Sequence, residues 1–263
     1  MVDLLSKNSY DINDLIRIVK ILRSPGGCQW DGEQTHKSIR RNMLEEAYEV
    51  AEAIDQESPE HLKEELGDVL LQVVFHASIE EDAGRFDLDQ VADGVCKKLI
   101  YRHPHVFGNV NVQSTDEILS NWEELKKTEK GQASQSDALD AVARSLPALW
   151  RAEKVQKKAA KVGFDWDNVS GAVDKLSEEV EEVKAAMAGN GDPAEELGDL
   201  LFAAVNVARF LEVDPEDALH AASDKFSSRF RRVEETVLAQ GKRMEDMTLA
   251  QLDEIWNQIK HQA

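Results

Sequence analysis

The feature that most constrains the fold of this chain of 263 residues is an internal repeat. The motif Glu-Glu-Leu-Gly-Asp occurs at residues 64–68 and again at residues 195–199, and other groups recur around it in the same order. Repetition in a fixed order indicates that each half is one structural unit. The matched groups are Trp30-Asp31 with Trp166-Asp167, residues 44–50 with 177–183, residues 64–70 with 195–201, Lys98 and Arg102 with Lys225 and Arg229, and Trp122 and Lys126 with Trp256 and Lys260. We therefore expect two tandem copies of one fold.

The apolar pattern of both halves predicts helices. Apolar residues recur at spacings of three and four almost everywhere, which is typical of amphipathic α-helices, whereas alternation over the length of a strand is scarce. Two such stripes are Leu15, Ile18, Val19 and Leu22, and Leu44, Ala47, Ala51 and Ile54. Only six prolines and 14 glycines interrupt the chain, which leaves room for long helices. We predict an all-α fold of two tandem repeated helical bundle domains.

A polar stretch separates the two copies. Between Lys127 and Asp137 the chain is polar, with several Ser and Gln and with Gly131, and it lacks apolar periodicity, a composition typical of a linker. The predicted organisation is therefore an N-terminal helical domain at residues 1–126, a linker at residues 127–140 and a C-terminal helical domain at residues 141–263.

Two helix starts are marked by an N-cap residue followed by proline, at Ser58-Pro59 and at Asp192-Pro193. Glu195 stands three residues after Asp192, which is the spacing of a capping box. Both Glu-Glu-Leu-Gly-Asp motifs therefore fall in the first two turns of a helix, where the helix dipole stabilises negative charge by ~0.3–1 kcal/mol.

A glycine lies inside each of these two helices, at Gly67 and Gly198. Glycine in the middle of a helix costs ~1 kcal/mol against alanine. We therefore expect a close approach of another helix, or a bound ligand, at these two positions.

The composition limits which binding partners the chain can have and which cellular compartment it is expected to occupy. The formal net charge is −20, so nucleic acid and anionic membrane would repel the chain and we expect neither as a partner. A phosphate-rich small molecule fits if a metal ion bridges the charges. Cys28 and Cys96 belong to no metal-spaced motif, residues 1–10 lack a signal-peptide core, and no apolar run reaches the ~18 residues of a membrane span. We expect a cytoplasmic protein.

Carboxylates in the C-terminal half have the spacing of a metal site. Residues three apart share a helix face, as Glu179 and Glu182 do on one predicted helix. Glu196 and Asp199 do so on the next. Four converging carboxylates repel one another without a cation, and hard cations such as Mg²⁺ take oxygen ligands. We therefore predict a Mg²⁺ site, and the repeat predicts a second, N-terminal one at Glu46, Glu49, Glu65 and Asp68.

Each of these features also has a plainer interpretation. Acidic runs on helices are usually solvated faces. Lys225 and Arg229 could be surface charges paired with nearby acids of their own helix. Trp256 could be a core or interface aromatic residue. The pairing of two carboxylate motifs, one of them at the head of an apolar helix, and the duplication of that pairing favour the metal site.

The later helices of the C-terminal copy carry groups that suit a phosphate-rich ligand. Lys225 and Arg229 share a helix face and could clamp phosphates. Trp256 could stack on a base or ribose while Lys260, four residues on, reaches a phosphate. The chain has no Gly-x-x-x-x-Gly-Lys-Ser/Thr phosphate loop and no Gly-x-Ser-x-Gly elbow. We expect water, and not a side chain, to be the nucleophile.

These residues resemble a known family. The Glu-x-x-Glu and Glu-x-x-Asp quartet is similar to that of the all-α nucleoside triphosphate pyrophosphatases, and the duplicated layout resembles the MazG family among them. Supporting motifs are Cys28-Gln29-Trp30-Asp31 with Gln34-Thr35, Arg102-His103-Pro104-His105-Val106-Phe107, and Gly163-Phe164-Asp165-Trp166. The resemblance runs from about residue 14 to the C-terminus. The quartet alone marks only the superfamily, and the repeat with these motifs is more specific.

The resemblance implies hydrolysis of nucleoside triphosphates, both ribo- and deoxyribo-, to the monophosphate and pyrophosphate. It also implies Mg²⁺ as cofactor, a homodimer and a cytoplasmic housecleaning role in the nucleotide pool. By motif, the Mg²⁺ ligands would be Glu179, Glu182, Glu196 and Asp199. The residues around the nucleotide would be Lys175, Glu178, Glu195, Lys225, Arg229, Trp256 and Lys260. Glu178 or Glu195 is the candidate for orienting or deprotonating the water that attacks the α-phosphorus.

One position distinguishes the two copies. Lys175 stands three residues before Glu178, whereas the matching place in the first half is Asn42. We therefore predict that the C-terminal site is the principal catalytic site and that the N-terminal site is weaker, specialised or mainly structural. The alternative to an enzyme is a non-catalytic helical dimer that senses nucleotides or binds a regulatory protein.

Overall fold

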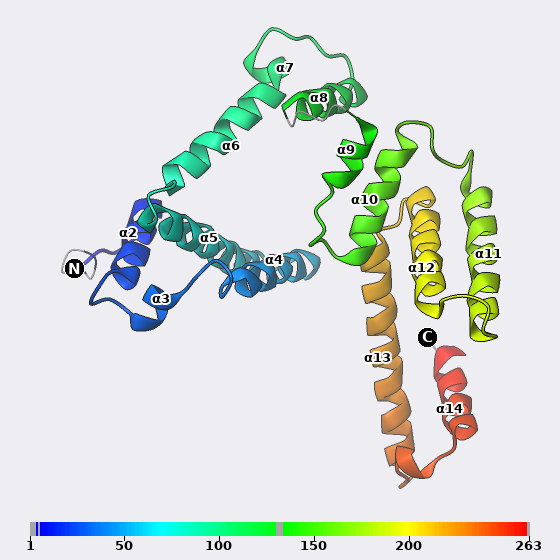
Figure 1. Cartoon of the computed structure of the whole chain (residues 1–263). Helices are drawn as coiled ribbons and strands as arrows, with labels where there is room; N and C mark the ends of the chain where they lie inside the picture. The colour runs from blue at the N-terminus through cyan, green and yellow to red at the C-terminus, as the bar shows by residue number, and fades with distance from the viewer. Residues whose placement is uncertain (1–3, 5, 130–133, 262–263) are drawn as a thin grey trace. The chain divides into compact units, whose positions relative to one another are not determined.

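Helices form every regular element in the part of the chain that the computed structural model describes, which is residue 4, residues 6–129 and residues 134–261 (Figure 1). The all-α prediction is therefore confirmed. The chain divides into two compact units, Met1–Lys126 (unit 1) and Lys127–Ala263 (unit 2). Among the described residues, no helix combines the length and the apolar character that a membrane span requires.

Unit 1 is organised around a hairpin of two helices. In this hairpin α4 (Arg40–Asp55) packs along α5 (Pro59–Asp82). The preceding α2 (Ile12–Arg23) packs against α5 and against the short α3 (Gln29–Glu33). The buried core consists of Val19, Ile39, Val74 and Phe75. The later helices are α6 (Leu88–Arg102), α7 (Pro104–Phe107) and α8 (Thr115–Glu129).

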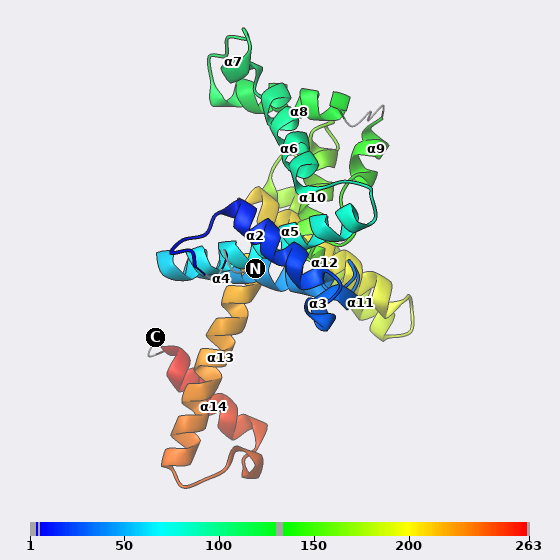
Figure 2. The same ribbon diagram turned by 90° about the vertical axis from the view of Figure 1, so that its left-hand side faces the viewer.

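Unit 2 contains a matching hairpin. Here α11 (Val169–Met187) lies alongside α12 (Pro193–Phe210), and α10 (Ala148–Ala160) also packs against α12 (Figure 1). The long α13 (Pro215–Ala239) leads through a 3-10 helix at Met244–Asp246 into α14 (Leu249–His261), which runs back along it (Figure 2). The core between these last helices consists of Val233, Val237, Ile255 and Ile259.

The two predicted helix starts are confirmed. Helix α5 begins at Pro59, and the Ser58 hydroxyl accepts a hydrogen bond from the backbone amide of His61. Helix α12 begins at Pro193, where the Asp192 side chain accepts from the amide of Ala194. This bond to the second residue of the helix replaces the bond to Glu195 that the capping-box spacing predicts. In α12 the start places Glu195 and Glu196 in the first turn, where the free amides of the helix N-terminus face them. In α5 the acidic motif begins five residues after Pro59, beyond the first turn, so the expected help from the helix dipole is confined to α12.

The stretch expected to be a linker, residues 127–140, is helical where it is described. Helix α8 continues to Glu129, and α9 (Gln135–Asp140) follows with a capping box between Ser134 and Asp137. This cap and the buried Ala138 explain why a polar sequence without long apolar periodicity still forms a helix. The remaining linker residues, 130–133, lie outside the described part, and the domain boundaries stay a prediction.

Of the two predicted apolar stripes, the first is partly buried and the second is exposed. Val19 of the first stripe lies in the core of unit 1. In the second, Leu44 is 43% exposed and Ile54 is 56% exposed, whereas the buried residue of α4 is Ala53. Helical periodicity identifies an apolar face but not what covers it, because burial depends on the neighbouring elements.

Candidate metal and nucleotide site

The α11–α12 hairpin brings three of the four predicted C-terminal ligands together. Glu179, Glu196 and Asp199 each present a carboxylate oxygen, and the three oxygens lie within 4.8 Å of one another. Glu179 is buried at 4% exposure, whereas Glu196 is half-buried and Asp199 is exposed. The cluster therefore has a closed side formed by α11 and an open side from which a ligand can enter.

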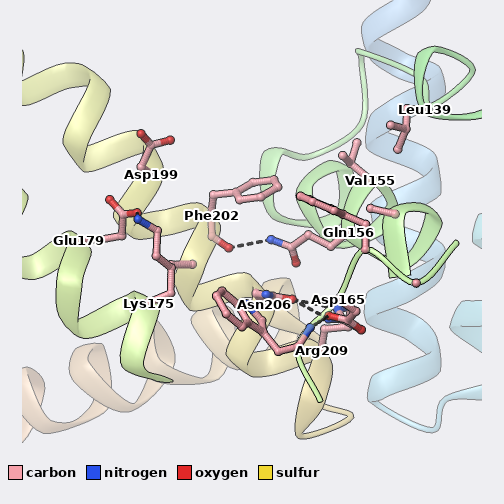
Figure 3. Close-up of a pocket in the computed structure, with 15 residues that line it drawn as sticks. Leu139, Val155, Gln156, Asp165, Lys175, Glu179, Asp199, Phe202, Asn206 and Arg209 are labelled. Atoms are coloured by element: carbon pink, nitrogen blue, oxygen red, sulfur yellow. Dashed lines mark hydrogen bonds and ion pairs between the residues drawn. The ribbon is translucent and has the colours of Figure 1, made fainter. Parts of the chain in front are cut away.

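Lys175 neutralises part of this cluster. Its Nζ lies 2.7 Å from Oε1 of Glu179, as Figure 3 shows for these two side chains. The same Nζ lies 2.8 Å from Oε1 of Glu178. The hydrogen bonds to these two carboxylates, Glu178 first, raise the pKa of the Lys175 ammonium. In return, the hydrogen bond from Lys175 lowers the pKa of the Glu179 carboxyl. Glu179 therefore stays ionised near neutral pH in spite of its burial.

Glu182, the fourth predicted ligand, borders the other three. Its Oε2 lies 4.0 Å from Nζ of Lys175. The pKa of the Glu182 carboxyl is raised because it hydrogen-bonds to Glu179, an interaction that exists only while Glu182 holds a proton. With both groups ionised, Oε2 of Glu179 is buried without a donor among the described residues. A buried carboxylate oxygen without a partner is costly, and a cation bound by this all-oxygen set would satisfy it.

The α4–α5 hairpin of unit 1 holds a second cluster. Oxygens of Glu46, Glu49 and Glu65 lie within 4.8 Å of one another. The fourth predicted residue, Asp68, lies close enough that its charge helps to raise the pKa of Glu46, although burial of Glu46 is the larger cause. The pKa of Glu65 is also raised, first by burial and then by the charge of Glu49.

The N-terminal cluster has its own basic partner, which was not among the residues predicted from the sequence. His61 on α5 places Nε2 3.0 Å from Oε1 of Glu65. The spacing of four residues between His61 and Glu65 was the available signal, because residues four apart share a helix face.

The groups expected to hold the nucleotide lie on different elements. Glu178 is exposed on α11, and Glu195 is exposed in the first turn of α12. Arg229 of α13 lies over the ring of Trp256 on α14, with 6.0 Å between the guanidinium carbon and the ring centroid. In unit 1, Arg102 lies over Trp122 in the same way, at 5.4 Å. The repeat therefore extends to contacts between helices.

No hydrogen bond or ion pair between described residues links the basic residues of α13 and α14 to the carboxylates of α11 and α12. The residues concerned are Lys225, Arg229 and Lys260 on one side and Glu179, Glu182, Glu196 and Asp199 on the other. The hairpin thus presents the acidic half of the predicted site, and α13 and α14 present the basic half separately.

A cavity of about 740 Å³ opens beside the C-terminal cluster. Lys175, Glu179 and Asp199 line one part of it (Figure 3). Gln156 of α10 and Trp166 line another part. The sequence does not mark Gln156 as a site residue, because a glutamine on an amphipathic helix carries no local sign of its surroundings.

The two glycines inside the acidic motifs do not mark a close approach of helices. A Cβ atom added at Gly67 or at Gly198 would meet no other atom within 4 Å. Within each unit, helix packing therefore does not explain these glycines, and a bound ligand is the alternative that stays as a prediction.

Comparison with known proteins bears on both hairpins. A family model described as the MazG nucleotide pyrophosphohydrolase domain matches residues 34–107 and residues 169–233. The first match covers α4 and α5, and the second covers α11 and α12. The family signature is thus present in both units, as the internal repeat requires.

Three relatives match along most of the chain. The nucleoside triphosphate pyrophosphohydrolase of Escherichia coli (strain K12) is 45% identical over 256 residues, which is 95% of this chain and 97% of the relative. The Thermotoga maritima protein named nucleoside triphosphate pyrophosphohydrolase/pyrophosphatase MazG is 44% identical over 250 residues, 94% of each chain. The Bacillus subtilis (strain 168) protein YabN is 50% identical over 248 residues, which is 92% of this chain but 50% of YabN.

Proposed function

This chain belongs to the MazG nucleotide pyrophosphohydrolase family and is a nucleoside triphosphate pyrophosphohydrolase, and we propose that Mg²⁺ at the α11–α12 carboxylates supports its reaction. The reaction converts a nucleoside triphosphate and water into the monophosphate and pyrophosphate. The observation that carries the metal proposal is the cluster of Glu179, Glu196 and Asp199, with oxygens within 4.8 Å and one buried oxygen of Glu179 without a donor. Both ribo- and deoxyribonucleoside triphosphates are the proposed substrates.

The proposed Mg²⁺ ligands are Glu179, Glu182, Glu196 and Asp199. When bound, Mg²⁺ would neutralise phosphate charge and act as a Lewis acid on a phosphoryl oxygen. Lys175 supports this arrangement, because its ammonium holds Glu179 in the ionised form that binds a cation. All of these donors are oxygens, which are the ligands that Mg²⁺ prefers.

The proposed chemical step is attack by water on the α-phosphorus. A phosphorus–oxygen bond to the water forms, the bond to the oxygen that bridges the α- and β-phosphates breaks, and pyrophosphate leaves. Glu178 or Glu195 would orient the water and take its proton. Both carboxylates are exposed on the α11–α12 hairpin, where a substrate can reach them. The basic residues Lys225, Arg229 and Lys260 would stabilise charge on the leaving pyrophosphate, with Trp256 beside the nucleotide.

A homodimer is the proposed assembly, and it accounts for the separation of the acidic and basic halves. Apolar side chains that a core would normally bury are exposed on both helices concerned, including Leu197 and Leu201 on α12 and Phe226 and Phe230 on α13. A second copy would cover such faces. It could also carry α13 and its cations to the carboxylates of the first copy.

Mixing two inactive variants tests this assembly. One variant is Asp199→Asn, and the other carries both Lys225→Ala and Arg229→Ala. If the second copy supplies the cations, mixed dimers contain one intact site and regain activity above that of either variant alone. If each chain completes its own site, mixing restores nothing. Light scattering measures the mass of each preparation.

The decisive assay for the function supplies Mg²⁺ and the protein with a mixture of ribo- and deoxyribonucleoside triphosphates. We expect pyrophosphate and monophosphates in equal amounts, and no turnover after the metal is chelated. Release of orthophosphate alone would indicate phosphatase cleavage instead. Metal-dependent binding without turnover would favour the nucleotide sensor. A cytoplasmic housecleaning role further predicts that loss of the protein raises non-standard nucleotides in the cellular pool.

A further inference from the structure

The cavity beside the C-terminal carboxylates has a second, mostly apolar part that the phosphates would not fill. The whole cavity has a volume of about 740 Å³, which lies in the range of small-molecule sites, roughly 300–1,000 Å³. We propose that this part of the cavity receives the nucleobase of the substrate and that Gln156 determines specificity by accepting a hydrogen bond from a base N–H. This inference rests on the proposed function, and it identifies the pocket for the base, which the proposed function does not assign.

Gln156 is a buried polar group with one unpaired atom. The side chain is 7% exposed, and its Nε2 donates a hydrogen bond of 2.8 Å to the backbone carbonyl of Phe202 (Figure 3). A carbonyl accepts only from a donor, so this bond fixes which end of the amide is which. The opposite end, Oε1, is buried with no partner among the described residues. An N–H group of a ligand would remove the cost of that unpaired acceptor.

A second amide lies near the first on the cavity wall. Asn206 uses its Oδ1 to accept from Nε and a terminal nitrogen of Arg209, at 3.0 and 2.8 Å. Arg209 also pairs with Asp165, which holds the guanidinium in place (Figure 3). Because these bonds use Oδ1, the NH₂ group of Asn206 is left to donate a hydrogen bond to a ligand. An acceptor on Gln156 and a donor on Asn206 complement nucleobase edges, which present N–H and acceptor atoms side by side.

Trp166 supplies a flat apolar surface in the same cavity. A Cβ atom on Gly171 would lie 2.9 Å from Cε3 of the Trp166 ring, so the ring rests directly on the backbone of α11 at that glycine. The side chain is still 48% exposed, which leaves a surface on which a base can stack. Trp256 is less available, because Phe226 packs 5.2 Å from its ring and Arg229 lies over it.

The two ends of the cavity share one helix face. Asp199, Ala203 and Asn206 recur on α12 at spacings of four and three residues, so they face the same way. Asp199 and Asn206 are therefore about 10 Å apart along the helix, at 1.5 Å per residue. A nucleotide with its phosphates at Asp199 and its base at Asn206 would span that face with its ribose between them.

Two matched variants test the role of Gln156. Gln156→Leu removes the amide from the cavity, and Gln72→Leu removes another buried glutamine with an unpaired Oε1, on α5 of unit 1. Calorimetry with Mg²⁺ measures the binding of α,β-methylene nucleoside triphosphates, which resist cleavage, and of inorganic tripolyphosphate, which has no base. We expect Gln156→Leu to weaken nucleotide binding about tenfold, the size of one hydrogen bond, without changing tripolyphosphate binding. Gln72→Leu should change neither.

Two results for Gln156→Leu would contradict the inference. Equal weakening of nucleotide and tripolyphosphate by Gln156→Leu would show a structural role, and unchanged nucleotide binding would show that the base lies elsewhere. Either result overturns the inference while the wild type still releases pyrophosphate. A wild type that binds the analogues but releases no pyrophosphate refutes the proposed reaction, and the binding comparison then still decides the role of Gln156.

Discussion

The two carboxylate clusters share a backbone design but differ in the charge that accompanies them. In unit 2, Lys175 lies 2.7 Å from Glu179 and lowers the pKa of that buried carboxyl. In unit 1, Asn42 stands at the matching place, and a basic partner is instead supplied by His61, on the other helix of the hairpin. The pKa values of Glu46 and Glu65 are raised by burial and by neighbouring carboxylates.

This difference shows how one substitution can separate two copies of a site. A lysine ammonium keeps a buried carboxylate ionised, so the C-terminal cluster is prepared to bind a cation near neutral pH. Without it, carboxylates of the N-terminal cluster hold protons more readily. The comparison therefore supports unit 2 as the principal catalytic unit, as the position of Lys175 predicts from sequence.

The largest expected effect comes from removing equivalent carboxylates in the two units. Asp199→Asn should lower the rate of pyrophosphate release by about 100-fold or more, because losing a proposed ligand should cost at least as much as losing a residue that only supports a ligand, roughly 10- to 100-fold. Asp68→Asn should change it by less than about twofold, because that cluster is expected to contribute little. Steady-state kinetics with saturating Mg²⁺ measures both. Glu182→Gln and Glu49→Gln form a second matched pair, and equal losses within either pair would contradict the asymmetry.

Exchanging the residue that distinguishes the units should have the next largest effect. Lys175→Asn makes unit 2 resemble unit 1, and we expect kcat/KM to fall about tenfold, as for loss of a charged hydrogen bond. The reciprocal change, Asn42→Lys, should raise the residual activity of an Asp199→Asn protein. If Asn42→Lys has no effect in that background, the lysine alone does not account for the difference.

A smaller effect concerns stability in acid and involves unit 1 alone. Glu80 is buried, and hydrogen bonds from Arg85, supported by His36, lower the pKa of its carboxyl to about 2. Unit 2 has Leu211 at the matching position. Because the folded pKa lies below the unfolded value of ~4.3, this group stabilises the fold above that pH and loses its contribution as the pH falls toward 2.

Thermal melting of the wild type and of Arg85→Met, from about pH 7 to about pH 3, measures this contribution. The variant should melt at a lower temperature at neutral pH, and its melting temperature should fall less on acidification, because the pKa of its Glu80 carboxyl is lowered by His36 alone and therefore depressed less. Parallel losses in the two proteins would show that Arg85 does not set the acid sensitivity.

The smallest effect is expected from the glycines inside the two acidic motifs. Gly67→Ala and Gly198→Ala should each raise the free energy of unfolding by up to about 1 kcal/mol, the difference in helix propensity, because a Cβ has space at both. Gly27→Ala is the contrasting control, since its Cβ would lie 2.2 Å from the carbonyl oxygen of Ile21. If substrate or a second copy occupies the space at Gly198, only Gly198→Ala should also lower activity.

Much of the candidate site was visible in the sequence because its parts are local. A spacing of three residues puts Glu196 and Asp199 on one helix face, and proline after Asp192 marks where that helix begins. The repeat marked Arg229 and Trp256 as positions with counterparts in the first half, but the contact between them was not predicted and comes from the packing of α13 on α14. His61 and Gln156 escaped notice because each acquires its role from the carboxylates or the cavity that packing brings to it.

The sequence by itself determined that this protein is a duplicated helical chain with one acidic hairpin in each half, because periodicity, caps and i,i+3 pairs act between residues close along the chain. Only the tertiary structure decided that Glu179 is the buried carboxylate of its cluster, that Glu182 lies at the edge and that Lys175 pairs with Glu179. It also decided that the stripe of Leu44 and Ile54 stays exposed. Burial and charge pairing depend on which faces meet, and that is settled by packing between helices distant in sequence.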